Sequence, residues 1–368
     1  MKKEEYQYTS IHYNDYLQLG KITDSQDLRS AEAGEPAHEE MLFIIVHQVY
    51  ELWFKQINHE MRSIMDMFDD DVVDERSIGV AVNRLNRIIE IFKLLVDQIR
   101  ILETMTPLDF LDFRKYLFPA SGFQSFQFRE LEVLMGLKEA NRHTYGGTPY
   151  KVVFDEKKKE ELTQMEKSRS LLELVEDWLE RTPFLNFDDF NFLESYKEAV
   201  TQMVQREKDA ITSTELLSEK FKALRLKALG DTDTYFENIF DEAKHNELLK
   251  EGKVQMSYKA TVAGLFINLY RDEPILQLPF QFLQKLTDID EYFTTWRYRH
   301  AQMVLRMLGR KVGTGGSSGH DYLNKTAQKH HIFGDLHNIS TLLIPRSDLP
   351  PLPEKISLKL GYYFSASY

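Results

Sequence analysis

The stretch WRYRHAQMVLRMLGRKVGTGGSSGHDYL, residues 296–323, joins a helical pattern to a loop of small residues. In its first half, large apolar residues and one histidine recur at three- and four-residue spacing, which predicts a helix with one apolar face. That face carries Trp296, His300, Met303, Val304, Met307 and Leu308. Gly309 then predicts the end of the helix. A histidine is therefore expected inside the apolar face of a long helix.

The loop that follows, residues 313–319, consists of glycine, serine and Thr314. Small side chains leave its backbone N–H groups accessible, so it can wrap around an anionic ligand. It is not a Walker phosphate loop, because no Gly-Lys-Ser/Thr follows, and Ser318 stands where a GxGxxG motif needs its third glycine. A structural interpretation stays open, since a buried histidine is often a hydrogen-bonded core residue and a Gly/Ser run is often a connector.

The composition excludes several classes of protein. With 46 Lys and Arg against 58 Asp and Glu, the net charge is −12, which argues against nucleic-acid and anionic-membrane partners. The absence of cysteine excludes disulfides, iron–sulfur clusters, thiolate haem ligands and cysteine nucleophiles. The N-terminus lacks an apolar targeting segment, and no stretch has the length of a membrane span. We therefore expect a cytoplasmic protein with no membrane partner.

Nearly all of the periodic sequence has the 3.6-residue repeat of helices. We predict helices over about 38–68, 74–105, 155–181, 194–230 and 279–308, and further helices that start at Thr106-Pro107 and Ser257. No change in composition divides the 368 residues into two domains. The predicted fold is a single all-α domain over residues 1–368, a helical bundle preceded by a polar, tyrosine-containing arm of residues 1–37.

Two further clusters lie on predicted helix faces. Phe43 and His47 are four residues apart, as are Phe110 and Arg114, so each pair shares one face of its helix. Arg114 either pairs with acidic neighbours at the surface or binds a carboxylate in the two-pronged manner of guanidinium groups. If both clusters converge with His300, they form a pocket with two histidines, aromatic walls and a cation for a carboxylate.

The number of available ligands favours haem over other metal sites. Without a thiolate, haem has to be held by a histidine, and one axial histidine leaves the opposite face open for oxygen. A zinc or non-haem iron site would need a third ligand, usually a carboxylate, and we identify none one turn from His47 or His300. On these residues alone the non-haem alternative stays open.

At these positions the sequence resembles the tryptophan 2,3-dioxygenase family. The similar motifs are FIIVHQ at 43–48, ELWFK at 51–55, LETMT at 102–106, LDF at 108–110, FR at 113–114, ASGFQS at 120–125, WRY at 296–298 with His300, and the loop at 313–319. The resemblance covers about residues 13–346, which is nearly the whole chain.

The resemblance implies an all-α haem enzyme of the tryptophan/indoleamine dioxygenase type. Such an enzyme, with one haem b per subunit, uses O₂ to cleave the indole C2–C3 bond of L-tryptophan. The product is N-formyl-L-kynurenine, in the first step of tryptophan catabolism by the kynurenine pathway. The resemblance also implies a homotetramer in which the N-terminal arm of one subunit covers the site of its neighbour, and Tyr13, Tyr16 and Leu17 match that arm.

The matching positions imply a role for each site residue. His300 matches the axial ligand of the haem iron, and His47 matches the distal histidine that accepts a hydrogen bond from the indole N–H. Arg114 matches the residue that binds the substrate carboxylate. Because some related enzymes have a tyrosine at the position of Phe110, the carboxylate should here depend more on Arg114. The expected substrate-binding residues are Tyr13, Tyr16, Phe43, Ile44, Ile45, Val46, His47, Phe110, Arg114 and Thr314, which meets the amino-acid end of the substrate.

Two alternatives differ in activity. A helical sensor or scaffold could bind haem or tryptophan without turnover, but the joint presence of His47, Arg114, Thr314 and His300 argues against a decayed site. A related dioxygenase could act on a different indole. Arg114 favours an amino acid over an amine such as tryptamine, because a buried unpaired arginine costs about 3–5 kcal/mol.

Overall fold

The computed structural model describes residues 10–142, 149–188, 190–309, 311 and 319–361, which are mostly helical. The all-α prediction is confirmed. The elements are α1 (Tyr13–Leu17), α2 (Gly20–Thr23), α3 (Arg29–Glu32), α4 (Glu39–Phe68), α5 (Glu75–Leu102), α6 (Pro107–Leu117), η1 (Gly122–Gln124), α7 (Phe126–Met135), η2 (Glu139–Asn141), η3 (Tyr150–Val153), α8 (Glu156–Lys167), α9 (Leu171–Glu180), β1 (Asn186–Phe187), β2 (Phe190–Asn191), α10 (Phe192–Ser213), α11 (Glu219–Ile239), α12 (Glu242–Lys250), α13 (Tyr258–Leu269), η4 (Pro274–Leu276), α14 (Gln277–Leu308), α15 (Gly319–Lys329), α16 (Gly334–Asn338), η5 (Ile339–Leu342), η6 (Arg346–Asp348) and α17 (Glu354–Leu360). Within the described ranges, no helix combines the length and the apolar character that crossing a membrane requires.

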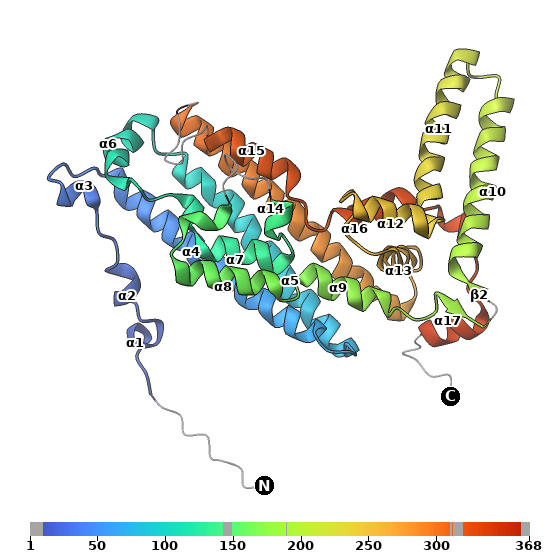
Figure 1. Cartoon of the computed structure of the whole chain (residues 1–368), viewed down its shortest axis with the longest axis horizontal. Helices are drawn as coiled ribbons and strands as arrows, with labels where there is room; N and C mark the ends of the chain where they lie inside the picture. The colour runs from blue at the N-terminus through green and yellow to red at the C-terminus, as the bar shows by residue number, and fades with distance from the viewer. Residues whose placement is uncertain (1–9, 143–148, 189, 310, 312–318, 362–368) are drawn as a thin grey trace, which may run out of the picture.

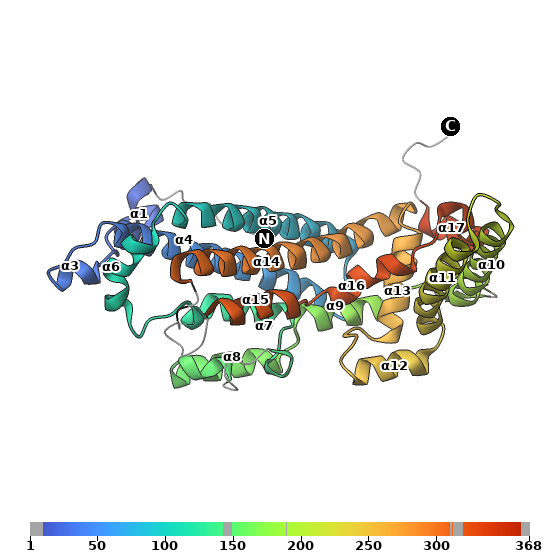
Figure 2. The same cartoon turned by 90° about the horizontal axis from the view of Figure 1, so that it is seen from above.

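The centre of the molecule is a bundle of three long helices, α4, α5 and α14, which run side by side in both views (Figures 1 and 2). Each helix buries an apolar face, and Ile57 on α4, Leu85 on α5 and Leu286 on α14 have no exposed surface. Aromatic rings join α4 to α14, where Phe68 stacks on Phe282 with 4.6 Å between the ring centroids. Full burial of each such side chain stabilises the folded state by about 1.5–3 kcal/mol. The packed bundle therefore holds the residues at its ends in defined positions.

Several predicted helix boundaries agree with the structure. α4 and α5 match the predicted ranges 38–68 and 74–105 to within a few residues. α6 starts as expected, because the side chains of Thr106 and Asp109 form a capping box at its first turn. α14 ends at Leu308, and Gly309 adopts a φ of 61°, in the left-handed region that favours glycine.

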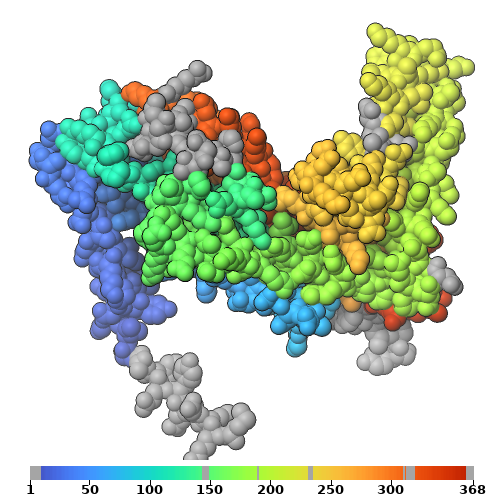
Figure 3. Space-filling view, viewed as in Figure 1, coloured from blue at the N-terminus to red at the C-terminus, as the bar shows by residue number. Residues whose placement is uncertain are grey.

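Two of the predicted helices are wrong in extent, because each is divided in the structure. The range 155–181 forms α8 and α9, where Ser170 caps α9 in a capping box with Glu173. The range 194–230 forms α10 and α11, where Ser218 caps α11 and the helix continues to Ile239. Charged, helix-favouring residues on both sides hide these breaks in the sequence. α10 and α11 project from the bundle at one end of the molecule (Figures 1 and 3).

The N-terminal arm, described from residue 10 onward, extends away from the bundle (Figures 1 and 3). It is fixed at α3, where the buried carboxylate of Glu40 accepts hydrogen bonds from the backbone N–H groups of Arg29 and Ser30, both at 2.9 Å. Before this anchor, α1 carries Tyr13 and Tyr16, which are each 71% exposed. The arm therefore presents two tyrosines outside its own bundle.

Candidate active site

His47 lies on α4, and the residue one turn earlier holds its ring. The Nδ1 atom donates a hydrogen bond to the carbonyl oxygen of Phe43 at 2.7 Å, and the two ring centroids are 4.1 Å apart. Burial lowers the pKa of His47, and the hydrogen bond to Phe43 opposes this effect in part. The ring is therefore neutral near pH 7. Because Nδ1 carries the proton, Nε2 is an acceptor, as an N–H donor such as indole requires.

Helix α6 adds an aromatic wall next to Phe43 and His47, and it carries Arg114 one turn further on. It contacts both α4 and α14, and its Phe110 ring centroid lies 5.7 Å from that of Phe43. Phe113 completes the wall, 5.4 Å from Phe43 and 5.3 Å from Phe110 between ring centroids. Arg114 follows Phe110 by one helical turn and is half-buried. The aromatic rings of the two clusters on α4 and α6 therefore lie together.

His300 lies near the end of α14, supported by a parallel indole ring. Trp296, one turn earlier, stacks on His300 with 5.3 Å between the ring centroids and 7° between the planes. Burial lowers the pKa of His300 to about 4, and the nearby His47 contributes to this shift, so the two histidines lie within electrostatic reach of each other. Among the described residues, no hydrogen bond holds the His300 ring. Its neutral form can therefore offer a nitrogen to a metal.

Haem fits this arrangement better than a metal ion held by several side chains. In the described ranges, no group of three or more His, Cys, Asp or Glu residues is placed to hold a metal ion. One neutral histidine on α14, a second histidine on α4 and an apolar aromatic wall are instead suited to haem with a single axial histidine. The fold and the site together define a class of helical protein suited to haem, with an arginine one turn from the aromatic wall.

The expectation that no carboxylate stands one turn from either histidine is wrong for His47. Glu51 follows it by four residues on α4, and this spacing is readable in the sequence. Burial raises the pKa of Glu51, and a hydrogen bond with Ser125 opposes this effect. Across the described residues a third ligand is still lacking, so Glu51 does not restore the non-haem iron alternative.

The remaining expected substrate-binding residues lie in different places. Ile44 is half-buried on α4, and Val46 is buried in the core. Ile45 is 42% exposed and lies on the side of α4 away from His47. The tyrosines of α1 lie on the extended arm, and Thr314 lies outside the described residues. The structure thus brings Phe43, His47 and Phe110 together, with His300 within electrostatic reach of His47. It places Ile45 and the arm tyrosines elsewhere.

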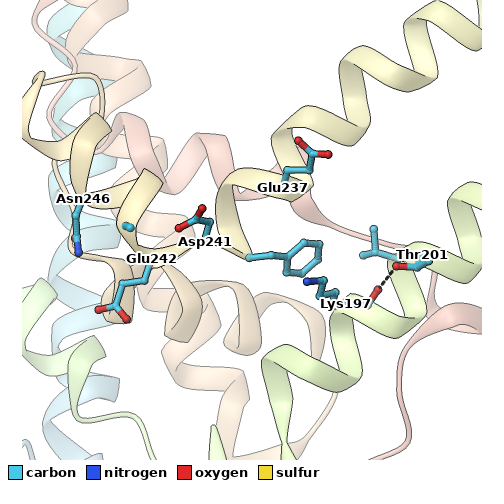
Figure 4. Close-up of a pocket in the computed structure, with 9 residues that line it drawn as sticks. Lys197, Thr201, Glu237, Asp241, Glu242 and Asn246 are labelled. Atoms are coloured by element: carbon cyan, nitrogen blue, oxygen red, sulfur yellow. Dashed lines mark hydrogen bonds between the residues drawn. The ribbon is translucent and has the colours of Figure 1, made fainter.

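A cavity of about 870 Å³ lies toward the other end of the molecule, between α10, α11 and α12 (Figure 4). Its lining includes the carboxylates of Glu237, Asp241 and Glu242, and Lys197, whose Nζ lies 5.5 Å from the Phe240 ring centroid. Among the described residues, neither a histidine nor an arginine lines it. Because its carboxylates would repel the carboxylate of an amino acid and it offers no haem ligand, we do not assign the active site to this cavity.

Comparison with known proteins identifies the family. The family model described as Tryptophan 2,3-dioxygenase matches residues 2–343. A tryptophan 2,3-dioxygenase of Bdellovibrio bacteriovorus is 49% identical over 357 residues, which cover 97% of this chain and 99% of that protein. The tryptophan 2,3-dioxygenase of Dictyostelium discoideum is 47% identical, over 96% of this chain and 89% of that protein. Tryptophan 2,3-dioxygenase B of Danio rerio is 47% identical, over 94% of this chain and 85% of that protein. The chain belongs to the tryptophan 2,3-dioxygenase family.

Family membership confirms three expectations from the sequence. The fold class is all-α, the reaction is that of a dioxygenase acting on tryptophan, and the family depends on haem.

Proposed function

We propose that this chain opens the indole ring of L-tryptophan with O₂, on a haem b held by His300. Both oxygen atoms enter the product, N-formyl-L-kynurenine, so the reaction balances without another oxidant or reductant. When bound, haem supplies the oxygen chemistry, and the protein supplies orientation and excludes water. The observation that carries the proposal is the pair of buried, neutral histidines, His300 and His47, on two helices that both contact α6.

His300 is the axial ligand in this proposal. A lowered pKa keeps its ring neutral and able to bind iron, and the stacked Trp296 restricts rotation of the ring. His47 orients the substrate, because its Nε2 accepts the indole N–H while Phe43 holds its Nδ1. His47 is not a base for this proton, since an indole N–H is far too weak an acid to lose it to a histidine near pH 7.

Arg114 binds the substrate carboxylate in this proposal, and the rings of Phe43 and Phe110 flank the indole. The distance of 5.7 Å between those two ring centroids supports their place in one wall. Phe110 has no hydroxyl group, so the guanidinium of Arg114 is the main partner of the carboxylate. Thr314 contacts the amino-acid end of the substrate.

We propose that the chain works as a homotetramer. The outer faces of α4 and α5 carry apolar side chains that are between 39% and 50% exposed, namely Met41, Ile45, Leu52, Val80, Leu94 and Ile101. An apolar groove of about 690 Å³ lies beside them. Burying such a face between subunits is favourable. The extended arm would then bring Tyr13 and Tyr16 to the site of a neighbour. Sedimentation should show smaller particles for Leu52→Glu, and an unchanged tetramer would contradict this interface.

The test of the activity is an absorption spectrum of the haem-loaded, dithionite-reduced protein, followed by addition of O₂ and L-tryptophan. Haem bands and growth of the N-formylkynurenine band are expected. Haem bands without product would favour the sensor alternative, and a haem-free protein from haem-supplemented cells would contradict the assignment of His300. The single-domain organisation over residues 1–368 and the cytoplasmic location stay predictions.

A further inference from the structure

A buried glutamate connects α7 to the helix that carries His300. Glu132 is 1% exposed, and arginines donate hydrogen bonds to both of its carboxylate oxygens. Oε1 accepts from Nη2 of Arg297 on α14 at 2.7 Å. Oε2 accepts from Nη1 of Arg129 at 2.7 Å and from Nη1 of Arg142. These four residues, here called the Glu132 cluster, join α7, the segment after η2, and α14.

Stability alone does not account for the Glu132 cluster. Burial would raise the pKa of Glu132, but the three guanidinium groups hold it well below its usual range, so the carboxylate stays ionised. Three buried arginines share this carboxylate, and within the described part of the chain Nε and Nη2 of Arg142 have no hydrogen-bond partner. Buried ion pairs are often no more stabilising than apolar side chains of the same volume, and surplus buried charge is costly. Such a network is better explained by what it holds in place.

Arg297 connects the Glu132 cluster to the haem ligand. Besides binding Glu132, it donates from Nη1 to the carbonyl oxygen of His330 at 2.8 Å, and its Cζ lies 3.9 Å from the centroid of the Phe293 ring. The guanidinium of Arg297 is therefore held by hydrogen bonds from both of its Nη atoms and by the Phe293 ring against its face. Arg297 precedes His300 by three residues, about 4.5 Å along the helix axis. A rotation or shift of α14 that moved His300 would break these contacts.

We propose that Glu132, acting through Arg297, is a positioning residue that sets the rotation and height of His300. Arg297 also adjoins Trp296, which stacks on His300, so the cluster fixes both the ligand and its support. This inference rests on the proposed function, in which His300 binds the haem iron. It adds a buried ion-pair network, made of residues other than those proposed to contact the substrate, that determines how firmly and in which orientation the His300 ring is held.

The test uses the full-length, haem-loaded protein and three variants. Arg297→Lys keeps the charge but loses the two-pronged contacts, and Glu132→Gln removes the charge at the centre of the cluster. Glu130→Gln is the matched control, because Glu130 lies on the same helix, is 8% exposed and pairs with Arg62. The readouts are the rate of haem loss to a scavenger protein, the iron–histidine stretching band of the reduced protein by resonance Raman, and kcat and KM measured separately.

We expect Arg297→Lys to raise the rate of haem loss by about tenfold, because groups that orient a metal ligand typically contribute about 10–100-fold to metal affinity. The iron–histidine band should shift, and kcat should fall while KM for tryptophan changes little. Glu130→Gln should match the parent. If Glu132→Gln does not fold, haem loss and the iron–histidine band of Arg297→Lys alone test the proposal. A parental band and parental haem loss in Arg297→Lys would overturn the positioning role, whereas a parental spectrum in His300→Ala would overturn the proposed function itself.

Discussion

The lowered pKa of His300 leads to a pH dependence of stability that can be worked out in advance. Burial lowers this pKa from 6.5 to about 4 in the folded protein. Protonating the folded protein at His300 is therefore about 3 kcal/mol less favourable than protonating the unfolded chain. Between pH 6.5 and 4 the unfolded chain binds more protons, so the free energy of unfolding falls as the pH falls through this window.

The magnitude follows from the same two values. From pH 7 to pH 5 the haem-free protein should lose about 1–2 kcal/mol of stability through His300, after allowance for the partial contact of its ring with solvent. His47 and His330 add to the loss, because burial lowers the pKa of each. The contribution of His300 is therefore not the whole loss of unfolding free energy between pH 7 and pH 5. It is the difference between the loss in the parent and the loss in a His300→Phe variant.

The assay is urea unfolding of the haem-free protein at pH 7 and pH 5, followed by tryptophan fluorescence and circular dichroism. His300→Phe should lose about 1–2 kcal/mol less than the parent between the two pH values. His59→Gln, at an exposed position of α4, is the matched control and should behave like the parent. If His300→Phe and the parent lost equal stability, the argument for a neutral, buried His300 would be refuted. The same neutrality lets the ring bind iron at pH 5.

Three substitutions test the roles of the site residues. His300→Ala should abolish tight haem binding, measured by the Soret band, and an unchanged band would refute its role as ligand. His47→Ala should keep haem but lower kcat by about tenfold, the value of one hydrogen bond of about 1.4 kcal/mol; steady-state rates equal to those of the parent would mean that His47 only packs. Arg114→Met should lower kcat/KM for L-tryptophan by about 30–1,000-fold, the equivalent of about 2–4 kcal/mol for a charged hydrogen-bonded pair. Competition assays should show little change in the binding of tryptamine, and a parallel loss for tryptamine would contradict the carboxylate contact.

Local patterns in the sequence predicted the helices that depend on local interactions. The apolar spacing of residues 38–68 defines α4, and the Thr106-Pro107-Leu108-Asp109 run contains all the groups of the capping box that starts α6. The breaks before Leu171 and Glu219 were not predicted, because long charged segments satisfy the helical pattern on both sides. The Ser170 and Glu173 pair is a capping-box signal that could have located the first break.

Contacts between residues that are far apart in the chain could not be predicted from the sequence. Phe43 and His47 could be placed on one face from their spacing, but their approach to Phe110 depends on how α6 packs on α4. The ion pair of Glu132 with Arg297 joins residues far apart in the chain, and neither carries a local signal of burial. Glu51 is the reverse case, because its spacing of four residues from His47 is a local signal that the sequence contains.

The most direct test of the central claim is the fate of the two oxygen atoms. The reduced, haem-loaded protein would be supplied with L-tryptophan and isotopically heavy O₂, and the N-formylkynurenine formed would be analysed by mass spectrometry. A dioxygenase that opens the indole ring should place both heavy atoms in each product molecule, with one O₂ consumed per tryptophan. A product with one heavy atom or none, or oxygen consumption that ends in hydrogen peroxide, would contradict the account.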